Sequence, residues 1–305
     1  MPRPERGAAH ESRHKIAPTV FQTDASYGQS DLPRMTWPTF SHEAMATTFQ
    51  VIIAGRPAEY ARQAAAAAFL ELDRLELELS RFIESSDIAR ANRLSAGASL
   101  VLGDDALQCL LSAAQISALT HRAFDPAYAS PRPTGSDEPL FALEPASHTL
   151  TSLTDRLQLD LGAVGKGYAL DRMADILAEW DVTSACLQSG GSTALALAVP
   201  PDAAGWPIGV AEEVLLFAHR AVSGSGIAVQ GAHLIDPRTG APARRTRRIW
   251  SFAASAAEAD ALSTAFFVMT DDAVVDFCQE HTGYGAVITL SEGPAQFQGE
   301  IGNRV

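Results

Sequence analysis

Three separated segments of the chain carry residues whose types and spacing suit the binding of a phosphorylated ligand. The first is 160–171, DLGAVGKGYALD, where a strand is expected to end and a helix to begin. Glycines let the backbone approach a ligand closely, and the free amides at a helix start attract phosphate. Lys166 adds a positive charge, and Lys15 is the only other lysine. The glycine spacing fits neither a Walker loop nor Gly-x-Gly-x-x-Gly, so an ordinary glycine-rich turn is the alternative.

The second segment is ADALSTA at 259–265. On a helix, Asp260 and Thr264 are four residues apart and lie on one face. A carboxylate and a hydroxyl, completed by water and substrate phosphates, are how Mg²⁺ is commonly held. The alternative is an Asp and a Thr on the solvent side of the helix.

The third segment combines SGSG at 223–226 with HLIDPRTG at 233–240. The Asp-Pro-x-Thr-Gly part predicts a turn that gathers polar groups. His233 is a candidate general base, and Asp236, three residues later, could orient its ring. A structural histidine that anchors the turn before Pro237 is the alternative.

These segments depend on the elements around them. Residues 1–36 are expected to be a flexible tail, and 37–305 one catalytic domain. The pattern predicts a strand ending in a turn at 55–57, a helix of about 25 residues from Ala58, and helices after Asp104, after 167 and over 257–269. Strands are expected at 184–188, 193–199, 206–211, 217–223 and 248–254, with a hairpin over 148–162. Strands in hairpins beside helices indicate an α+β fold rather than a doubly wound sheet.

Composition excludes several classes of protein. The 305 residues are 47% hydrophobic, which is enough to form a large core and rules out disorder throughout. A net charge of −13 disfavours binding to nucleic acid or to anionic lipid. Three scattered cysteines predict neither a disulfide framework nor a zinc ribbon. No apolar run is long enough for a membrane span, and no signal peptide or lipobox is visible, so a cytoplasmic location is expected.

The chain resembles the FAD:protein FMN transferase family, the ApbE-like flavin transferases, over most of 37–290. The resemblance depends on stretches that follow the family's order along the chain: AMATTF, SRF, SDIARANRL, FDPAY, DLGAVGKGYALD, SGG, SG at 223–224, HLIDPRTGAPA and ADALSTAFFVM. The two long motifs, DLGAVGKGYALD and HLIDPRTGAPA, are the most specific of these.

The resemblance implies two intertwined α+β subdomains of mixed or antiparallel sheet with packed helices, and FAD in the crevice between them. It implies that Mg²⁺ is held by the carbonyl of Ala163 and the side chains of Asp260 and Thr264, and that His233 serves catalysis. Asp236 is expected to assist His233 because of its place in the same turn. The residues expected to contact FAD are Met45, Thr47, Ser80, Asp125, Asp160, Gly162, Lys166, Gly167, Ser189, Gly190, Gly191, Ser223, Gly224, His233 and Thr239.

The activity that the resemblance implies is Mg²⁺-dependent transfer of FMN from FAD to a Ser or Thr hydroxyl of an acceptor flavoprotein, with release of AMP. A metal-dependent FAD pyrophosphatase, which gives FMN and AMP, and an FAD-binding protein without transfer activity are the alternatives. The chain departs from the family pattern where Ala46 replaces a glycine, where Ser192 replaces an aspartate and where Val222 replaces a threonine. The 126–150 loop is also short. The Ala46 change is expected to narrow the flavin pocket.

Overall fold

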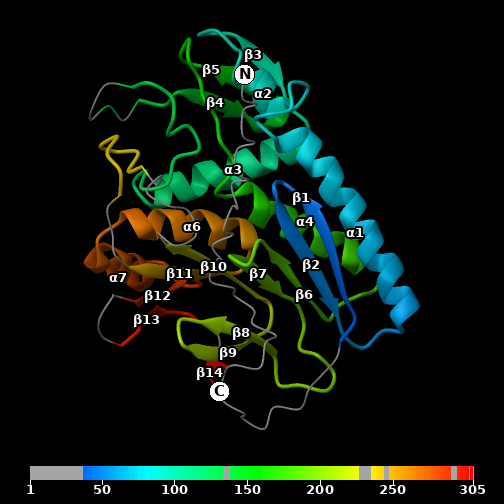
Figure 1. Ribbon diagram of the computed structural model, residues 1–305. Helices are drawn as coiled ribbons and strands as arrows, with labels where there is room; N and C mark the ends of the chain where they lie inside the picture. The colour runs from blue at the N-terminus through cyan, green and yellow to red at the C-terminus, as the bar shows by residue number, and fades with distance from the viewer. Residues whose placement is uncertain are drawn as a thin grey trace, which may run out of the picture.

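A central antiparallel sheet organises the molecule (Figure 1). The computed structural model describes residues 37–132, 136, 138–226, 235–243, 247–289, 294–301 and 303–304. Within these ranges every neighbouring pair of strands in the sheet runs antiparallel. In spatial order the strands are β1 (Thr39–Ala44), β2 (Thr47–Ile53), β6 (Ala185–Ser189), β7 (Thr193–Ala196), β10 (Arg220–Gly226), β11 (Arg248–Ala253), β12 (Gly285–Thr289) and β13 (Gln296–Gly299).

One face of this sheet is covered by helices because alternate strand residues point toward them. The helices gathered on this side are α1 (Ala58–Leu79), α3 (Asp104–Leu119), α4 (Gly165–Glu179) and α6 (Ala256–Val268). α7 (Asp271–Glu280) lies beside β12 and β13. The helices and this face of the sheet share the larger hydrophobic core.

The other face packs against a small sheet made of β14 (Asn303–Arg304), β9 (Glu213–Phe217) and β8 (Trp206–Val210). Phe217 of β9 stacks on Phe252 of β11, with ring centroids 5.9 Å apart. Trp206 and Ile208 are fully buried in the same second core. The central sheet therefore separates two cores, and the motif residues of the site are found on its helical side.

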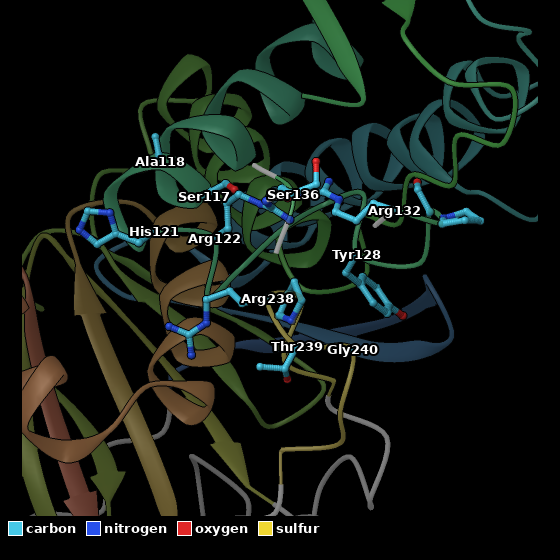
Figure 2. A pocket seen from close by; sticks show the side chains of 13 residues that line it. Ser117, Ala118, His121, Arg122, Tyr128, Arg132, Ser136, Arg238, Thr239 and Gly240 are labelled. Atoms are coloured by element: carbon cyan, nitrogen blue, oxygen red, sulfur yellow. Dashed lines mark hydrogen bonds between the residues drawn. The ribbon is translucent and has the colours of Figure 1, made fainter. Parts of the chain in front are cut away.

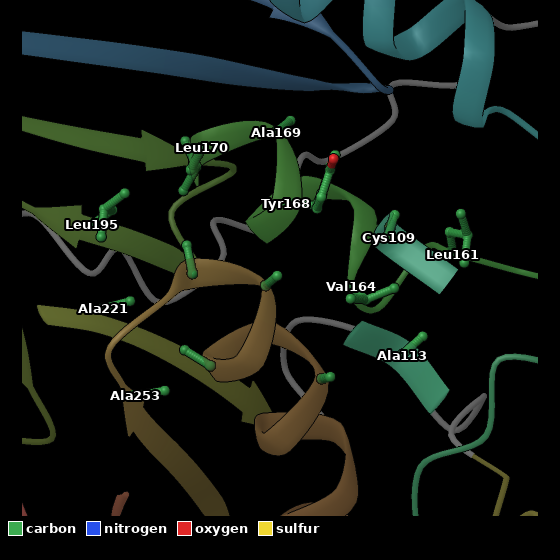
Figure 3. Packing of buried hydrophobic residues seen from close by; sticks show 14 of the residues in the cluster. Cys109, Ala113, Leu161, Val164, Tyr168, Ala169, Leu170, Leu195, Ala221 and Ala253 are labelled. Atoms are coloured by element: carbon green, nitrogen blue, oxygen red, sulfur yellow. The ribbon is translucent and has the colours of Figure 1, made fainter. Parts of the chain in front are cut away.

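α4 and α6 approach each other unusually closely (Figure 3). A Cβ atom on Gly167 would lie 2.1 Å from the carbonyl oxygen of Ala256, so no larger residue fits at this position of α4. α6 is buried over nearly its whole surface, and α4 buries Ala169, Leu170 and Met173. The two helices thus form one rigid unit under the sheet.

A third, smaller sheet flanks the helices and consists of β3 (Ser99–Val101), β5 (Thr149–Ser152) and β4 (Phe141–Glu144). A 3₁₀ turn (Pro145–Ser147) joins β4 to β5. The short helix α2 (Asp87–Ala91) precedes β3, and the Ser86 hydroxyl caps it by accepting from the amide of Ala89 at 3.0 Å.

The hairpin expected over 148–162 is wrong. Only Thr149–Ser152 forms a strand, and it pairs with β3 and β4. Leu157, Leu159 and Leu161 alternate as in a strand and are all buried. Side chains bond to their backbone, however: the Leu159 amide donates to Asn92 Oδ1 at 2.6 Å. Burial of every second residue, which is typical of a strand, occurs here without a neighbouring strand.

Two segments that were each expected to form a single strand are instead divided by residues with positive φ. Met45 (φ 50°) and Ala46 (φ 58°) form the turn between β1 and β2. His219 (φ 50°) separates β9 from β10 within the expected strand 217–223. The predicted α+β class with antiparallel sheets is confirmed. Among the described residues, no helix has the length and apolar character needed to cross a bilayer.

Candidate functional site

The 160–167 loop lies between adjoining cavities that together form a crevice. A central cavity of about 330 Å³ is lined by Ala123, Phe124, Asp125, Tyr128, Asp160, Gly162, Ala163, Ile235, Pro237 and Thr264. It brings together residues from the first, second and third motif segments. Its volume lies within the range typical of small-molecule sites.

On one side of the loop is the hairpin cavity, about 180 Å³, named for its place beside the β1–β2 turn. It shares Asp160 and Gly162 with the central cavity. Its other lining residues are Met45, Ala46, Glu76, Leu79, Ser80, Arg81, Phe82, Leu161, Gly165 and Lys166. Several of these are apolar, which suits a flat ring system more than a phosphate.

On the other side is the arginine cavity, about 680 Å³, which shares Tyr128 and Pro237 with the central cavity. Figure 2 shows Arg122, Arg132 and Arg238 around it, together with Thr239 and Gly240. The three cavities adjoin one another through these shared residues, and together we call them the crevice. The glycine-rich loop lies between the hairpin cavity at one end and the other two cavities.

The loop presents positive electrostatic character to the crevice. Asp160 Oδ1 accepts from the amide of Gly162 at 2.9 Å, and this bond holds the loop in a turn. α4 then begins at Gly165 without a side-chain cap. The Lys166 ammonium donates to the Gly162 carbonyl and lies 3.9 Å from Asp260 Oδ2. The Gly165 amide donates to the Leu161 carbonyl at 2.6 Å and the Gly167 amide to Asp260 Oδ2. The Lys166 ammonium, beside the positive end of the helix dipole, can attract an anion such as phosphate.

Asp260 is held behind this loop by three donors. Its Oδ2 accepts from the amide of Gly167 at 3.2 Å. Its Oδ1 accepts from Thr193 Oγ1 at 3.1 Å and from Ser223 Oγ at 3.2 Å. The residue is only 5% exposed. Asp260 is therefore fixed in position relative to both the loop and the sheet.

Thr264 lies one helical turn after Asp260, and both Thr264 and Ala163 line the central cavity. The three proposed metal donors are a carboxylate, a hydroxyl and a backbone carbonyl, which are the oxygen donors that Mg²⁺ prefers. Among the described residues, no cluster of three or more His, Cys, Asp or Glu side chains could hold a metal by itself. The residues present therefore fit a single Mg²⁺ that takes its remaining ligands from water and substrate.

Thr193, two residues after the SGG motif, and Ser223 of the SG motif donate to Asp260 from the sheet. Ser189 and Thr193 are paired across β6 and β7 and so face the same side of the sheet, toward α6. Ser189 Oγ is buried without a hydrogen-bond partner. Gly190 (φ 57°) makes the turn, where a Cβ would lie 2.5 Å from Thr47 Oγ1, and Gly191 follows it.

Ser223 and Gly224 face opposite sides of β10. Ser223 contacts Asp260, whereas a Cβ on Gly224 would lie 3.0 Å from Trp250 Nε1 in the second core. The Gly224 amide donates to the carbonyl of Ser192 at 2.8 Å. Side-chain hydroxyls, including Ser263 and Ser225, continue the polar network beyond Ser223.

Two predicted contact residues, Asp125 and Asp160, place carboxylates in the central cavity. Asp125 is 7% exposed, and its Oδ2 lies 3.1 Å from Arg132 Nη2 and 3.4 Å from Arg122 Nε. Asp160 Oδ2 accepts from the Tyr128 hydroxyl at 3.3 Å. Burial, followed by the charge of Asp160, raises the pKa of Tyr128, so its hydroxyl remains a donor at neutral pH.

The remaining predicted residues lie at both ends of the crevice. The Met45 amide donates to Glu76 Oε1 at 2.9 Å, and Ser80 Oγ accepts from the amide of Phe82 at 3.2 Å. Ala46 also lines the hairpin cavity, where the family glycine was expected. At the other end, Thr239 lies in an exposed turn.

His233 lies outside the described residues. Asp236, its expected partner, accepts from Arg238: Oδ1 from Nε and Oδ2 from Nη2, both at 2.9 Å. The carboxylate is therefore already engaged by a guanidinium in the turn. The role expected for Asp236 in orienting His233 stays a prediction.

Several residues of the crevice were missed from the sequence. Glu76 lies inside an amphipathic helix where nothing distinguishes it. Thr193, which holds Asp260 behind the crevice, follows the SGG motif after one residue, Ser192. Tyr128, within FDPAY, joins two cavities, and Phe82 within SRF is exposed beside the hairpin cavity. Both aromatic residues lie inside motifs that the sequence analysis identified, so their membership in these motifs could have indicated that they belong to the site.

The geometry defines a class of protein: an α+β protein with a two-ended crevice around an uncapped helix start and a buried carboxylate. Residues 45–288 match the model of the ApbE family, and the chain belongs to this family. The chain is 27% identical over 302 residues to a Treponema pallidum protein named FAD:protein FMN transferase, and the alignment covers 82% of this chain and 83% of that protein.

Solved structures have the same fold. The flavin transferase ApbE from Vibrio cholerae superposes with a TM-score of 0.75 at 18% identity and covers 85% of this chain and 96% of its own. The apo flavinyl transferase ApbE from Pseudomonas stutzeri gives 0.74 at 22% identity, with 88% and 97% covered. The ApbE protein from Thermotoga maritima gives 0.75 at 22% identity, with 86% and 97% covered.

Proposed function

We propose that this chain is an FAD:protein FMN transferase, which moves FMN from FAD onto a Ser or Thr hydroxyl of an acceptor flavoprotein and releases AMP. The observation that carries the proposal is the position of the Gly162–Lys166 loop between two ends of one crevice. A dinucleotide has two ring systems joined by a pyrophosphate. FAD that crosses the loop would place its pyrophosphate at the helix start and its two halves on either side.

The reaction that this site would perform is a phosphoryl transfer. The acceptor oxygen attacks the phosphorus on the flavin side, and the bond from that phosphorus to the bridging oxygen breaks. AMP leaves with the bridging oxygen, and the acceptor hydroxyl gives its proton to a base. The Lys166 ammonium at the start of α4 would bind the pyrophosphate oxygens, where negative charge increases in the transition state.

Asp260, Thr264 and the Ala163 carbonyl would hold Mg²⁺. When bound, the ion neutralises charge on the pyrophosphate oxygens. The hydroxyls of Thr193 and Ser223 and the Gly167 amide keep the Asp260 carboxylate in place before substrate arrives. His233 is the proposed base that takes the acceptor proton, and such a base contributes about 10²–10⁴-fold in rate.

A direct test incubates the purified chain with FAD and Mg²⁺, with and without synthetic peptides that carry Ser-Gly-Ala-Thr or Thr-Gly-Ala-Thr, the acceptor motif that the resemblance to flavin transferases implies. AMP, FMN and flavinyl-peptide are separated by chromatography and identified by mass. We expect AMP in amounts equal to flavinyl-peptide. The matched control peptide has alanine in place of each hydroxyl residue and should remain unmodified.

Each alternative gives a different set of products. AMP and FMN in equal amounts, independent of peptide, would identify an FAD pyrophosphatase. FAD that binds but stays intact with acceptor peptide and Mg²⁺ would indicate a flavin carrier. FAD that does not bind at micromolar protein in a calorimeter would contradict the proposal at its first step.

The role of His233 has its own test. A His233→Ala variant should lower turnover while FAD affinity stays unchanged, and the wild-type rate should rise with pH through the histidine pKa, about 6.5. A variant that melts early and binds FAD weakly would instead identify His233 as a structural residue of the turn.

A further inference from the structure

We infer that Asp171, the last residue of the glycine-rich motif, is a positioning residue that sets α6, and with it Asp260 and Thr264, against the loop that carries the Ala163 carbonyl. The inference rests on the metal site proposed above and concerns a residue that lies outside it. Asp171 touches neither the metal donors nor the cavities described above. It acts through the start of α6.

The contact is a carboxylate shared by two backbone amides. The Ala256 amide donates to Asp171 Oδ1 at 2.7 Å, and the Ala257 amide donates to Oδ2 at 2.9 Å. These are the first two amides of α6, which have no partner inside the helix. Asp171 itself belongs to α4, so the bond connects two helices instead of capping its own.

A second connection between α4 and α6 lies one helical turn earlier. The Gly167 amide donates to Asp260, and the Gly167 backbone lies against the Ala256 carbonyl. Asp171 and Gly167 are four residues apart on α4, so they face α6 from the same side. Together they determine how far α6 can slide or rotate relative to the loop. Because Thr264 and Asp260 are on α6 and Ala163 is on the loop, this setting decides the distance between the metal donors.

The Asp171 carboxylate has no described cation beside it. Asp175 on its own helix and Glu258 on α6 are both acidic and face it, while Cys109 of α3 is a neutral thiol nearby. The face of α1 toward the core is alanine and leucine. Burial raises the pKa of Asp171 to about 7, although the two amides act in the opposite direction. Ionised Asp171 offers two full acceptors, and protonation removes one of them.

The test measures metal affinity directly, with Mn²⁺ as an EPR-visible probe for the Mg²⁺ site of the full chain. We expect Asp171→Asn to weaken Mn²⁺ binding by about fivefold at pH 8, because an amide nitrogen then faces one backbone amide. In the wild type, affinity should fall about threefold from pH 8 to pH 6, as Asp171 takes up a proton, whereas Asp171→Asn should show no such change.

Two control variants separate positioning from general weakening. Ser255→Ala removes the other cap of the same helix end, where Ser255 Oγ accepts from the Glu258 amide at 3.2 Å, and leaves the Asp171 contact intact. Asp175→Asn removes a nearby charge on α4 that is paired with Arg172. Ser255→Ala should keep wild-type Mn²⁺ affinity and its pH dependence. Asp175→Asn should keep the affinity at pH 8 and shift the fall in affinity to lower pH, because the Asp175 charge raises the pKa of Asp171. If Ser255→Ala weakens binding as much as Asp171→Asn, Asp171 is only a helix cap and the inference is overturned.

The failure of this inference is distinguishable from failure of the metal site itself. Asp260→Asn must abolish tight Mn²⁺ binding if the metal site is correctly placed. Normal binding in Asp260→Asn would contradict the metal site, while normal binding and a normal pH profile in Asp171→Asn alone would contradict the role of Asp171. Should Asp171→Asn not fold, the wild-type profile decides, because flat affinity between pH 6 and pH 8 would overturn the inference.

Discussion

Two regions of the site hold their carboxylates by different means. We call Asp260 and its donors behind the loop the Asp260 end, and the residues around the arginine cavity the arginine end. Asp260 is fixed by neutral donors from a helix and two strands, with one ammonium group nearby. Asp125 and Asp236 are fixed by guanidinium groups from loops. The neutral donors do not cancel the negative charge of Asp260, and the Lys166 ammonium 3.9 Å away offsets only part of it, so a cation can still use it. Guanidinium pairs cancel the charge of their carboxylates, which suits them to shaping a loop.

The two regions also differ in how firmly the backbone holds their residues in position. β7, β10, α4 and α6 are packed in the core, and their backbones have little freedom. The residues at the arginine end lie on connecting segments, where an exposed ion pair stabilises little. Chemistry that needs fixed distances is therefore expected at the Asp260 end, and adjustable contacts at the other.

The largest effect is expected for Asp260→Asn. The amide oxygen can still accept from Thr193 and Ser223, so folding should survive, but the charge that a metal needs is lost. Turnover should fall about 10²–10³-fold, as expected when charge stabilisation by a metal is removed. The measurement is the rate of AMP release against Mg²⁺ concentration. If AMP release by the variant depends on Mg²⁺ as in the wild type, the Asp260 charge does not serve a metal. The contrast with the paired carboxylates at the arginine end would then be lost.

A smaller effect is expected for Lys166→Met, which keeps the length of the side chain and removes its charge. A hydrogen bond to a charged group contributes about 1.5–3 kcal/mol, so FAD should bind about tenfold more weakly or worse. Calorimetry with FAD gives the affinity. The matched control is Arg62→Met, since Arg62 is an exposed cation of α1 that pairs with Glu59 away from the cavities, and this variant should bind FAD with wild-type affinity.

At the arginine end, Arg132→Met should act on stability more than on chemistry. It removes one of two guanidinium groups beside the buried Asp125, which is expected to cost about 1–3 kcal/mol of the free energy of unfolding. Thermal unfolding would record a lower Tm. A large loss of turnover without a change in Tm would show that this end takes part in the reaction, and the comparison would have to be revised.

The smallest effect is expected for Arg238→Gln. Arg238 is 39% exposed and pairs with Asp236 within one turn, so the pair should contribute under about 1 kcal/mol. Unfolding in denaturant, followed by circular dichroism, should give a midpoint close to wild type. A marked destabilisation would mean that the turn is as constrained as the Asp260 end.

Local patterns in the sequence identified much of the site. Glycines before a helical stripe located the start of α4 to within three residues, because much of the signal for a helix start lies in nearby residues. The spacing of Asp260 and Thr264 placed both on one helix for the same reason. The α+β class followed from the order of strands and helices, and the matched motifs identified the family.

Contacts between distant segments could only be decided by the tertiary structure. Nothing in the sequence indicated that Leu157, Leu159 and Leu161 would be buried without a partner strand, because side chains far along the chain satisfy their backbone. Nor could it show that Gly224 faces away from Asp260, since that depends on the register of β10.

Asp171 shows the same difference between what local sequence determines and what tertiary packing determines. The sequence determined that an acidic residue ends the glycine-rich motif, and the helical pattern determined that it lies on α4. That its carboxylate accepts from the first amides of α6, 85 residues later in the chain, follows only from how the two helices pack. Their close approach depends on Gly167 meeting Ala256, and such a contact exists only once the core has formed around both helices.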